Sequence, residues 1–190
     1  MEYARMRAIA EELGAYAEGL DGAWRVEVGP AGPVLAMSRR PKRHAGTLHR
    51  LRILLDGQLT STHPGHRCLS GPLIEHPGLG RLYRPDAVVL PETALDEDGL
   101  AADSTTALAV LTVIPPSGPD HPGSDYAALG VPRHLIADPR SGTVEVHSAP
   151  RHGRYARTAC HRYGDDVPFG PWTVATADFR RYGKAGDRTV

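Results

Sequence analysis

Residues 134–147 read HLIADPRSGTVEVH and contain the clearest structural signal in the chain. Two short segments rich in apolar residues, 134–138 and 143–147, flank the sequence Pro139-Arg140-Ser141-Gly142. Proline and glycine favour tight turns, and the alternation around Val144 and Val146 is typical of a strand with one buried face. The segment therefore predicts a β-hairpin.

Two further apolar runs lie upstream and predict strands inside a sheet. The first is Ala87-Val88-Val89-Leu90, and the second spans residues 107–114. Continuous apolar, β-branched runs suit central strands that are covered on both faces. The acidic segment 92–104 between them predicts a surface loop.

The N-terminal third predicts two helices and another hairpin. Apolar side chains recur at three- and four-residue steps from Tyr3 to Tyr16, the pattern of an amphipathic helix. Alternation over 24–28 and the short run 34–37 flank a Gly- and Pro-rich turn, which predicts a hairpin. A second helix is expected over 44–59, with one apolar face formed by Leu48, Leu51 and Leu55.

The other segments give weaker signals. Residues 60–80 predict a loop with one short strand near Cys68, and residues 126–129 predict the end of a short helix. Short strands are expected around Tyr155 and over 172–175, followed by a polar tail.

Composition bounds the class of protein. The 190 residues fit one domain with short extensions. The 22 basic and 22 acidic residues balance, so overall charge does not favour nucleic acid as a partner. All basic residues except Lys42 and Lys184 are arginines, which suits phosphate geometry but can equally reflect genome base composition. Two cysteines and the absence of a signal-peptide core or membrane-spanning stretch predict a soluble, cytoplasmic protein.

Several of these segments, in this order, resemble the putative restriction endonuclease family of the Uma-two type, within the PD-(D/E)XK nuclease-like superfamily. The most specific part is Tyr126 to Val146, with its Gly-Val-Pro, Asp-Pro and Val-Glu-Val sequences. The other matching pieces are Val26-Glu27-Val28, Ser38 to His44, Arg84 to Val89, Leu111 to Ser117 and Pro168-Phe169-Gly170.

The resemblance implies an α/β fold, a restriction-endonuclease-like mixed β-sheet with flanking helices. We expect an N-terminal helical extension at 1–22, the nuclease-like domain at 23–182 and a polar tail at 183–190. The implied activity is Mg²⁺-dependent hydrolysis of DNA phosphodiester bonds. A homodimer is also plausible by analogy with such folds.

The implied metal ligands are Asp86 and Glu27, but two further family positions have changed. Thr112 stands where the family has a glutamate, and a neutral hydroxyl is a poor substitute for a carboxylate ligand. Pro122 lies nearest to the position of the family's lysine. We therefore expect Asp86, Glu27 and Thr112 to form a degenerate catalytic site, unless Asp120 or Asp125 replaces the missing carboxylate.

Each candidate residue also has a structural interpretation. Asp86 could cap a turn, and Glu27 could be an outward residue of a hairpin. The candidate phosphate contacts are Arg40, Lys42, Arg43 and His44, with Arg39 beside them. This basic cluster could contact phosphates or form a solvated surface. His44 could instead pack at a helix end. The segment 63–68 offers potential zinc ligands, but no second pair stands out.

Two hypotheses follow from the sequence. One is a DNA-directed, Mg²⁺-dependent endonuclease relative, and the other is a non-catalytic binding or interaction module that retains the nuclease scaffold.

Overall fold

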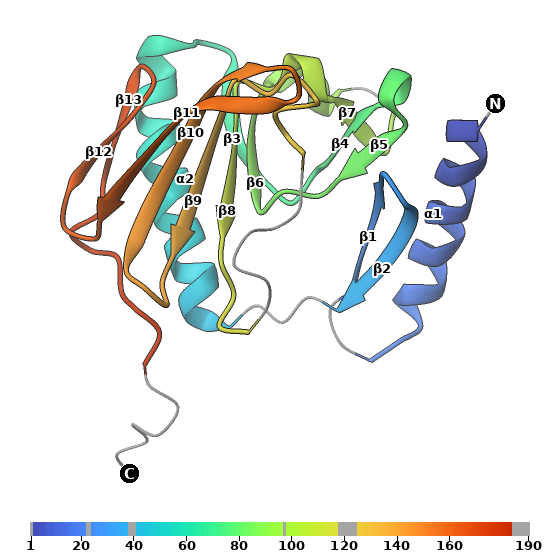
Figure 1. Cartoon of the computed structure of the whole chain (residues 1–190), viewed down its shortest axis with the longest axis horizontal. Coiled ribbons are helices and arrows are strands. Elements are labelled where there is room, and N and C mark those ends of the chain that lie inside the picture. The colour runs from blue at the N-terminus through green and yellow to red at the C-terminus, as the bar shows by residue number, and fades with distance from the viewer. Residues whose placement is uncertain (1, 22–23, 38–40, 97, 118–124, 184–190) are drawn as a thin grey trace.

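A mixed six-stranded sheet lies at the centre of the protein, in a computed structural model that describes residues 2–21, 24–37, 41–96, 98–117 and 125–183 (Figure 1). The strand order is β11-β10-β9-β8-β6-β3. Strands β8 and β9 are parallel, and the other neighbours are antiparallel. The strands are β3 (His66–Ser70), β6 (Ala87–Pro91), β8 (Ala109–Val113), β9 (Arg133–Asp138), β10 (Thr143–Arg151) and β11 (Arg154–Arg162). The expected mixed α/β architecture is confirmed.

The hairpin predicted from residues 134–147 is formed by β9 and β10. Asp138 pairs with Thr143, and the N–H of Gly142 donates to the carbonyl of Asp138 at 2.8 Å. Gly142 has φ +73°, a conformation that side chains with a Cβ rarely adopt. The neighbouring strands β6 and β8 are the expected central strands, because nearly all of their residues are buried.

Helix α2 (Lys42–Thr62) covers one face of this sheet. Its buried face extends the predicted leucine row by one further turn, through Leu59. The same face of the sheet is covered by the hairpin of β12 (Asp166–Phe169) and β13 (Trp172–Ala175), which lies beside α2 in Figure 1. The Gln58 side chain joins the two, since its amide donates to the carbonyl of Thr173 and accepts from its N–H.

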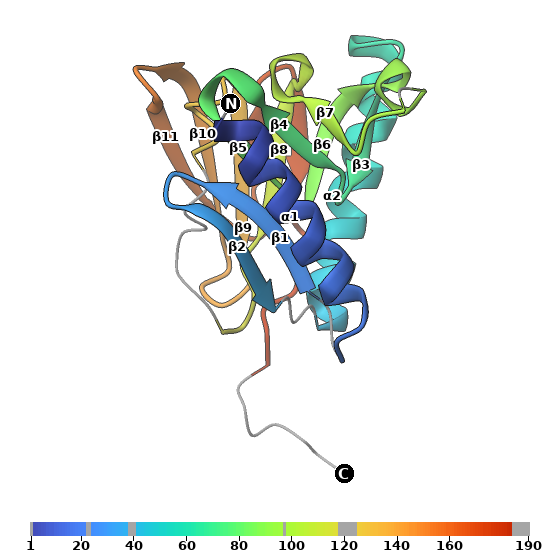
Figure 2. The same cartoon turned by 90° about the vertical axis from the view of Figure 1, so that its right-hand side faces the viewer.

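A second, five-stranded sheet lies on the other side of the molecule, and α1 (Glu2–Glu18) packs against it (Figure 2). Its order is β2-β1-β5-β4-β7. The strands are β1 (Trp24–Gly29), β2 (Gly32–Met37), β4 (Leu73–His76), β5 (Arg81–Tyr83) and β7 (Ala101–Asp103). The expected N-terminal helix and the first hairpin are both confirmed.

The sequence prediction for residues 60–80 was incomplete. It gave one strand near Cys68, whereas this stretch contains β3, β4 and the 3₁₀ helix η1 (Pro77–Leu79). Strands as short as β4 and β5 show no periodicity, and their pairing partners β1 and β7 are distant in sequence. Two more 3₁₀ helices, η2 (Glu92–Leu95) and η3 (Ser104–Thr106), interrupt the expected loop before β8.

The expected helix end near residue 129 is a turn over 126–130 in the described part of the chain, closed by a bond from the Leu129 N–H to the Asp125 carbonyl. No helix among the described residues is long and apolar enough to span a lipid bilayer.

Candidate functional site

Asp86 lies at the entrance to β6, level with Thr112 on the neighbouring strand. The register Ala87–Leu111 continues by one residue on each strand, which brings these two positions together. Asp86 is only 7% exposed, and its Oδ2 accepts a hydrogen bond of 2.8 Å from the backbone N–H of Val113. This contact fixes the carboxylate against β8 inside the protein.

His44 approaches the same carboxylate oxygen from α2. Its Nε2 lies 3.4 Å from Oδ2 of Asp86, and the residue is 2% exposed. The first turn of α2 thus points this imidazole toward the sheet. From sequence, His44 was considered both as a phosphate contact and as a residue that packs at a helix end, and its burial beside Asp86 fits the packing role.

Thr112, which the family resemblance aligns with a carboxylate, has a neutral partner. Its Oγ1 lies 2.8 Å from Nε2 of His134, and both residues are buried. Burial lowers the pKa of His134 to about 3, with a smaller contribution from His147. At neutral pH the pair is therefore an uncharged hydroxyl and an uncharged imidazole.

Aromatic and titratable side chains surround His134. The ring of Tyr126 meets it edge-on, with centroids 4.9 Å apart, and the ring of His147 lies at 6.0 Å. His147 is in turn 3.1 Å from Oε2 of Glu145. From sequence, both histidines were predicted only as hairpin residues. The predicted hairpin register contained the missing signal, because it places His134 directly opposite His147.

Glu27 reaches the chain just before Asp86 from the other sheet. Its Oε1 accepts from the backbone N–H of Arg84 at 3.4 Å and lies 3.9 Å from Nε of Arg25. The β1 strand therefore directs this carboxylate to a position two residues upstream of Asp86, where it also contacts a guanidinium group.

The described residues do not fit a divalent metal centre of the expected kind. Across 2–21, 24–37, 41–96, 98–117 and 125–183, no three His, Cys, Asp or Glu side chains are grouped so that they could hold a metal ion. Mg²⁺ prefers several oxygen ligands, and Asp86 already engages a backbone donor and an imidazole. Asp120 and Pro122 lie outside the described residues, whereas Asp125 lies close enough to Tyr83 to raise its pKa, after the larger effect of burial.

The segment 63–68, considered as a zinc site from sequence, also lies among the described residues that contain no metal-holding group of three side chains. Its two histidine rings are 5.9 Å apart, and Cys68 is fully buried, which raises the pKa of its thiol to about 12.

A groove lined by cations runs along the first turns of α2. It has a volume of about 370 Å³ and combines the start of α2 with a segment near the C-terminus. Its charged side chains are Lys42, Arg43, Arg50, Arg180 and Arg181. Lys42 and Arg43 were predicted as phosphate contacts from sequence, and Arg39 and Arg40 lie outside the described residues. Arg50, Arg180 and Arg181 were not predicted from sequence. Arg180 and Arg181 lie about 130 residues after Arg50 along the chain, so no local pattern connects them with α2.

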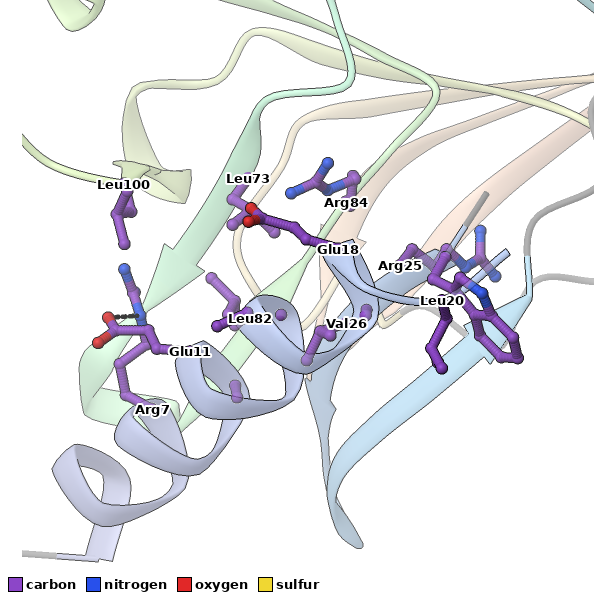
Figure 3. Close-up of a pocket in the computed structure, with 15 residues that line it drawn as sticks. Arg7, Glu11, Glu18, Leu20, Arg25, Val26, Leu73, Leu82, Arg84 and Leu100 are labelled. Carbon is purple, nitrogen blue, oxygen red and sulfur yellow. Dashed lines mark hydrogen bonds and ion pairs between the residues drawn. The ribbon is translucent and has the colours of Figure 1, made fainter. Parts of the chain in front are cut away.

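Another hollow, of about 540 Å³, lies between α1 and the five-stranded sheet (Figure 3). Its lining mixes three arginines with two glutamates over an apolar floor that includes Leu82. The two hollows therefore differ in charge. A third hollow, of about 860 Å³, resembles the groove in that its only charged side chains are Arg133 and Arg157.

Comparisons with known proteins agree with this fold. A model of the Uma2 family, described as putative restriction endonuclease, matches residues 10–171. A solved structure titled as a putative nuclease belonging to DUF820, from Anabaena variabilis ATCC 29413, is similar in fold with a TM-score of 0.59 and 12% identity. The match covers 82% of this chain and 89% of that one. No curated protein matches the chain.

Proposed function

The chain belongs to the Uma2 family of putative restriction endonucleases, and we propose that it is a member that binds nucleic acid without cleaving it. In this proposal the nuclease scaffold is kept, whereas metal-dependent hydrolysis is lost. The protein then acts as a binding module rather than an enzyme.

The observation that supports this proposal is the pairing of Thr112 with His134 beside Asp86. Metal-dependent cleavage needs carboxylates that hold a cation, which activates water and neutralises charge on the phosphate. Here the hydroxyl of Thr112 bonds to a neutral imidazole at 2.8 Å. Among the described residues, Thr112 offers Asp86 a neutral hydroxyl at the level of β8 and no group of three metal-ligating side chains is present, which does not favour retention of a divalent ion.

Binding of nucleic acid is supported by the cationic groove. The whole chain has no net charge, so five cations in one groove represent a local concentration rather than a general property. Nucleic-acid affinity depends largely on contacts between such cations and phosphates. The groove is lined by Arg43, and the next residue, His44, approaches Asp86 with its Nε2 3.4 Å from Oδ2.

Mg²⁺-dependent endonuclease activity is the second candidate function. It is favoured by the buried position of Asp86 at the mouth of a central strand and by the approach of Glu27 to the same segment. This activity would need a further ligand from the part of the chain outside the described residues.

A plasmid assay separates the two. Supercoiled DNA is incubated with the wild type and with Asp86→Asn, in Mg²⁺, in Mn²⁺ and in EDTA, and nicking and gel retardation are both recorded. We expect retardation of equal strength with and without metal, and no nicking by either protein. Nicking by the wild type that requires metal and is lost in Asp86→Asn would refute the proposal. The absence of any retardation would refute it as well.

A further inference from the structure

We propose that the groove between α2 and residues 180–181 is the site that holds the phosphodiester backbone, and that this segment near the C-terminus is one of its two walls. The inference rests on the proposed function and identifies the surface that performs it. It assigns a binding role to Arg50, Arg180 and Arg181.

Among the described residues, the charges of the groove have no acidic counterpart within it. Lys42, Arg43 and Arg50 are exposed on α2, whose first turn contains no acidic residue. None of the residues that line the groove is acidic. The closest acidic contact is Asp178, which lies 4.0 Å from Arg180 and has a side chain that is 84% exposed. Like charges this close repel one another, and an anionic ligand relieves that repulsion.

The second wall is fixed in place by residues on both sides of the two arginines. Phe179 is 4% exposed and belongs to the core that α2 covers. The hydroxyl of Tyr182 donates to the carbonyl of Ile114 at 2.8 Å, and its backbone N–H donates to Pro139 at 2.9 Å. Arg180 and Arg181 are therefore held at defined positions between two anchors.

The two walls also contact each other directly. Nη1 of Arg43 donates to the carbonyl of Arg181 at 2.7 Å. The guanidinium group of Arg181 packs over Gly142, so closely that a Cβ at this position would collide with it. The groove is thus a built feature that joins α2, the β9–β10 turn and the C-terminal segment.

A polymer fits the groove better than an isolated anion because five cations from two segments line it. A nucleic-acid strand carries one phosphate per nucleotide and can contact several of these cations at once. The residues that follow Arg43 and Arg181 lie near Asp86: Nε2 of His44 is 3.4 Å from its Oδ2, and burial, with a contribution from the charge of Asp86, raises the pKa of Tyr182 to about 12.

The exposed strand β11 provides a charge-matched comparison. Arg154 and Arg157 are exposed there, outside the groove. Arg157 borders a different hollow, in which Arg133 is the other charged residue. Reversal of Arg154 and Arg157 changes the net charge of the protein as much as reversal of Lys42 and Arg50.

The test measures binding of a short fluorescein-labelled DNA duplex by anisotropy over a range of salt concentrations. It compares the wild type, Lys42→Glu/Arg50→Glu and Arg154→Glu/Arg157→Glu, each checked for an unchanged circular dichroism spectrum. We expect the groove variant to bind at least about tenfold more weakly, with a salt dependence about two units shallower in log–log slope. The β11 variant should stay within about threefold of the wild type.

Each alternative result has a defined meaning. If the wild type binds and the groove variant binds equally well, or if both variants lose affinity to the same degree, the groove is not the phosphate site. If the wild type fails to bind DNA, the proposed function fails together with this inference. If a low concentration of inorganic phosphate displaces the DNA completely, the groove is a small-anion site, and the assignment to a polymer is overturned.

Discussion

The hydroxyl of Thr112 and the Nε2 atom of His134 lie 2.8 Å apart inside the six-stranded sheet, one on each of two parallel strands. Both members of this pair are neutral at neutral pH. Each partner satisfies the hydrogen-bonding capacity of the other inside the protein, so the pair contributes to stability.

Replacing Thr112 by valine should destabilise the protein by about 1–3 kcal/mol, because the shape is kept while Nε2 of buried His134 loses its partner. Urea denaturation of both proteins gives the difference in free energy of unfolding. Thr60→Val is the matched control, since Thr60 is exposed on α2, and its effect should stay near about 0.5 kcal/mol. Equal effects of the two substitutions would mean that the Thr112–His134 bond contributes nothing.

The protein should lose stability as the pH falls below neutral, and His134 should account for part of this loss. Its pKa is lowered by burial to about 3 in the folded protein, so the unfolded chain takes up a proton near pH 6.5 while the folded chain does not. Stability that is fully present above pH 6.5 is then lost toward pH 3, at up to about 1.4 kcal/mol per pH unit.

The variant His134→Gln isolates this effect, since glutamine can bond to Thr112 but does not titrate. Urea midpoints at a series of pH values should fall less steeply for the variant than for the wild type. Parallel curves would show that His134 is protonated equally easily in the folded and unfolded states.

Much of this architecture follows from local sequence. The β9–β10 hairpin, the central strands β6 and β8, and the leucine face of α2 all arise from patterns of a few residues, and they form as predicted. The position of Asp86 beside Thr112 follows from the family resemblance and agrees with the strand register.

The parts that were not predicted depend on contacts between distant segments. Arg43 meets the carbonyl of Arg181 across 138 positions, and no local pattern encodes such a contact. The burial of His44 against Asp86 likewise requires the angle at which α2 packs on the sheet. The short strands β4 and β5 exist because each completes the ladder of its neighbours, not because of their own propensity.

Removing the hydroxyl of Tyr182 should weaken the C-terminal wall of the groove. Tyr182→Phe deletes the hydrogen bond to Ile114, which we expect to cost about 1 kcal/mol and to reduce DNA affinity severalfold. Denaturation and fluorescence anisotropy give the two values. Tyr16→Phe is the control, because Tyr16 is 65% exposed on α1 and should change neither value. An unchanged affinity for Tyr182→Phe would show that the anchor at this residue does not shape the groove.

A methyl group at position 142 should disturb the fold and the groove together. Gly142 has φ +73°, and its added Cβ would collide with Arg181, so Gly142→Ala should destabilise the protein by about 1–3 kcal/mol. It should also lower DNA affinity, since Arg181 must move. In the control Gly29→Ala the new Cβ meets no atom within 4 Å, and the free energy of unfolding should change much less. A milder effect at position 142 than at position 29 would contradict the packing described here.

The central claim is that the cluster around Asp86 does not retain a divalent cation. Isothermal titration of the wild type and of Asp86→Ala with millimolar Mn²⁺ at neutral pH tests it most directly. We predict the same weak, non-saturating heats for both proteins. A saturable single-site isotherm in the wild type that disappears in Asp86→Ala would contradict the claim and restore the endonuclease interpretation.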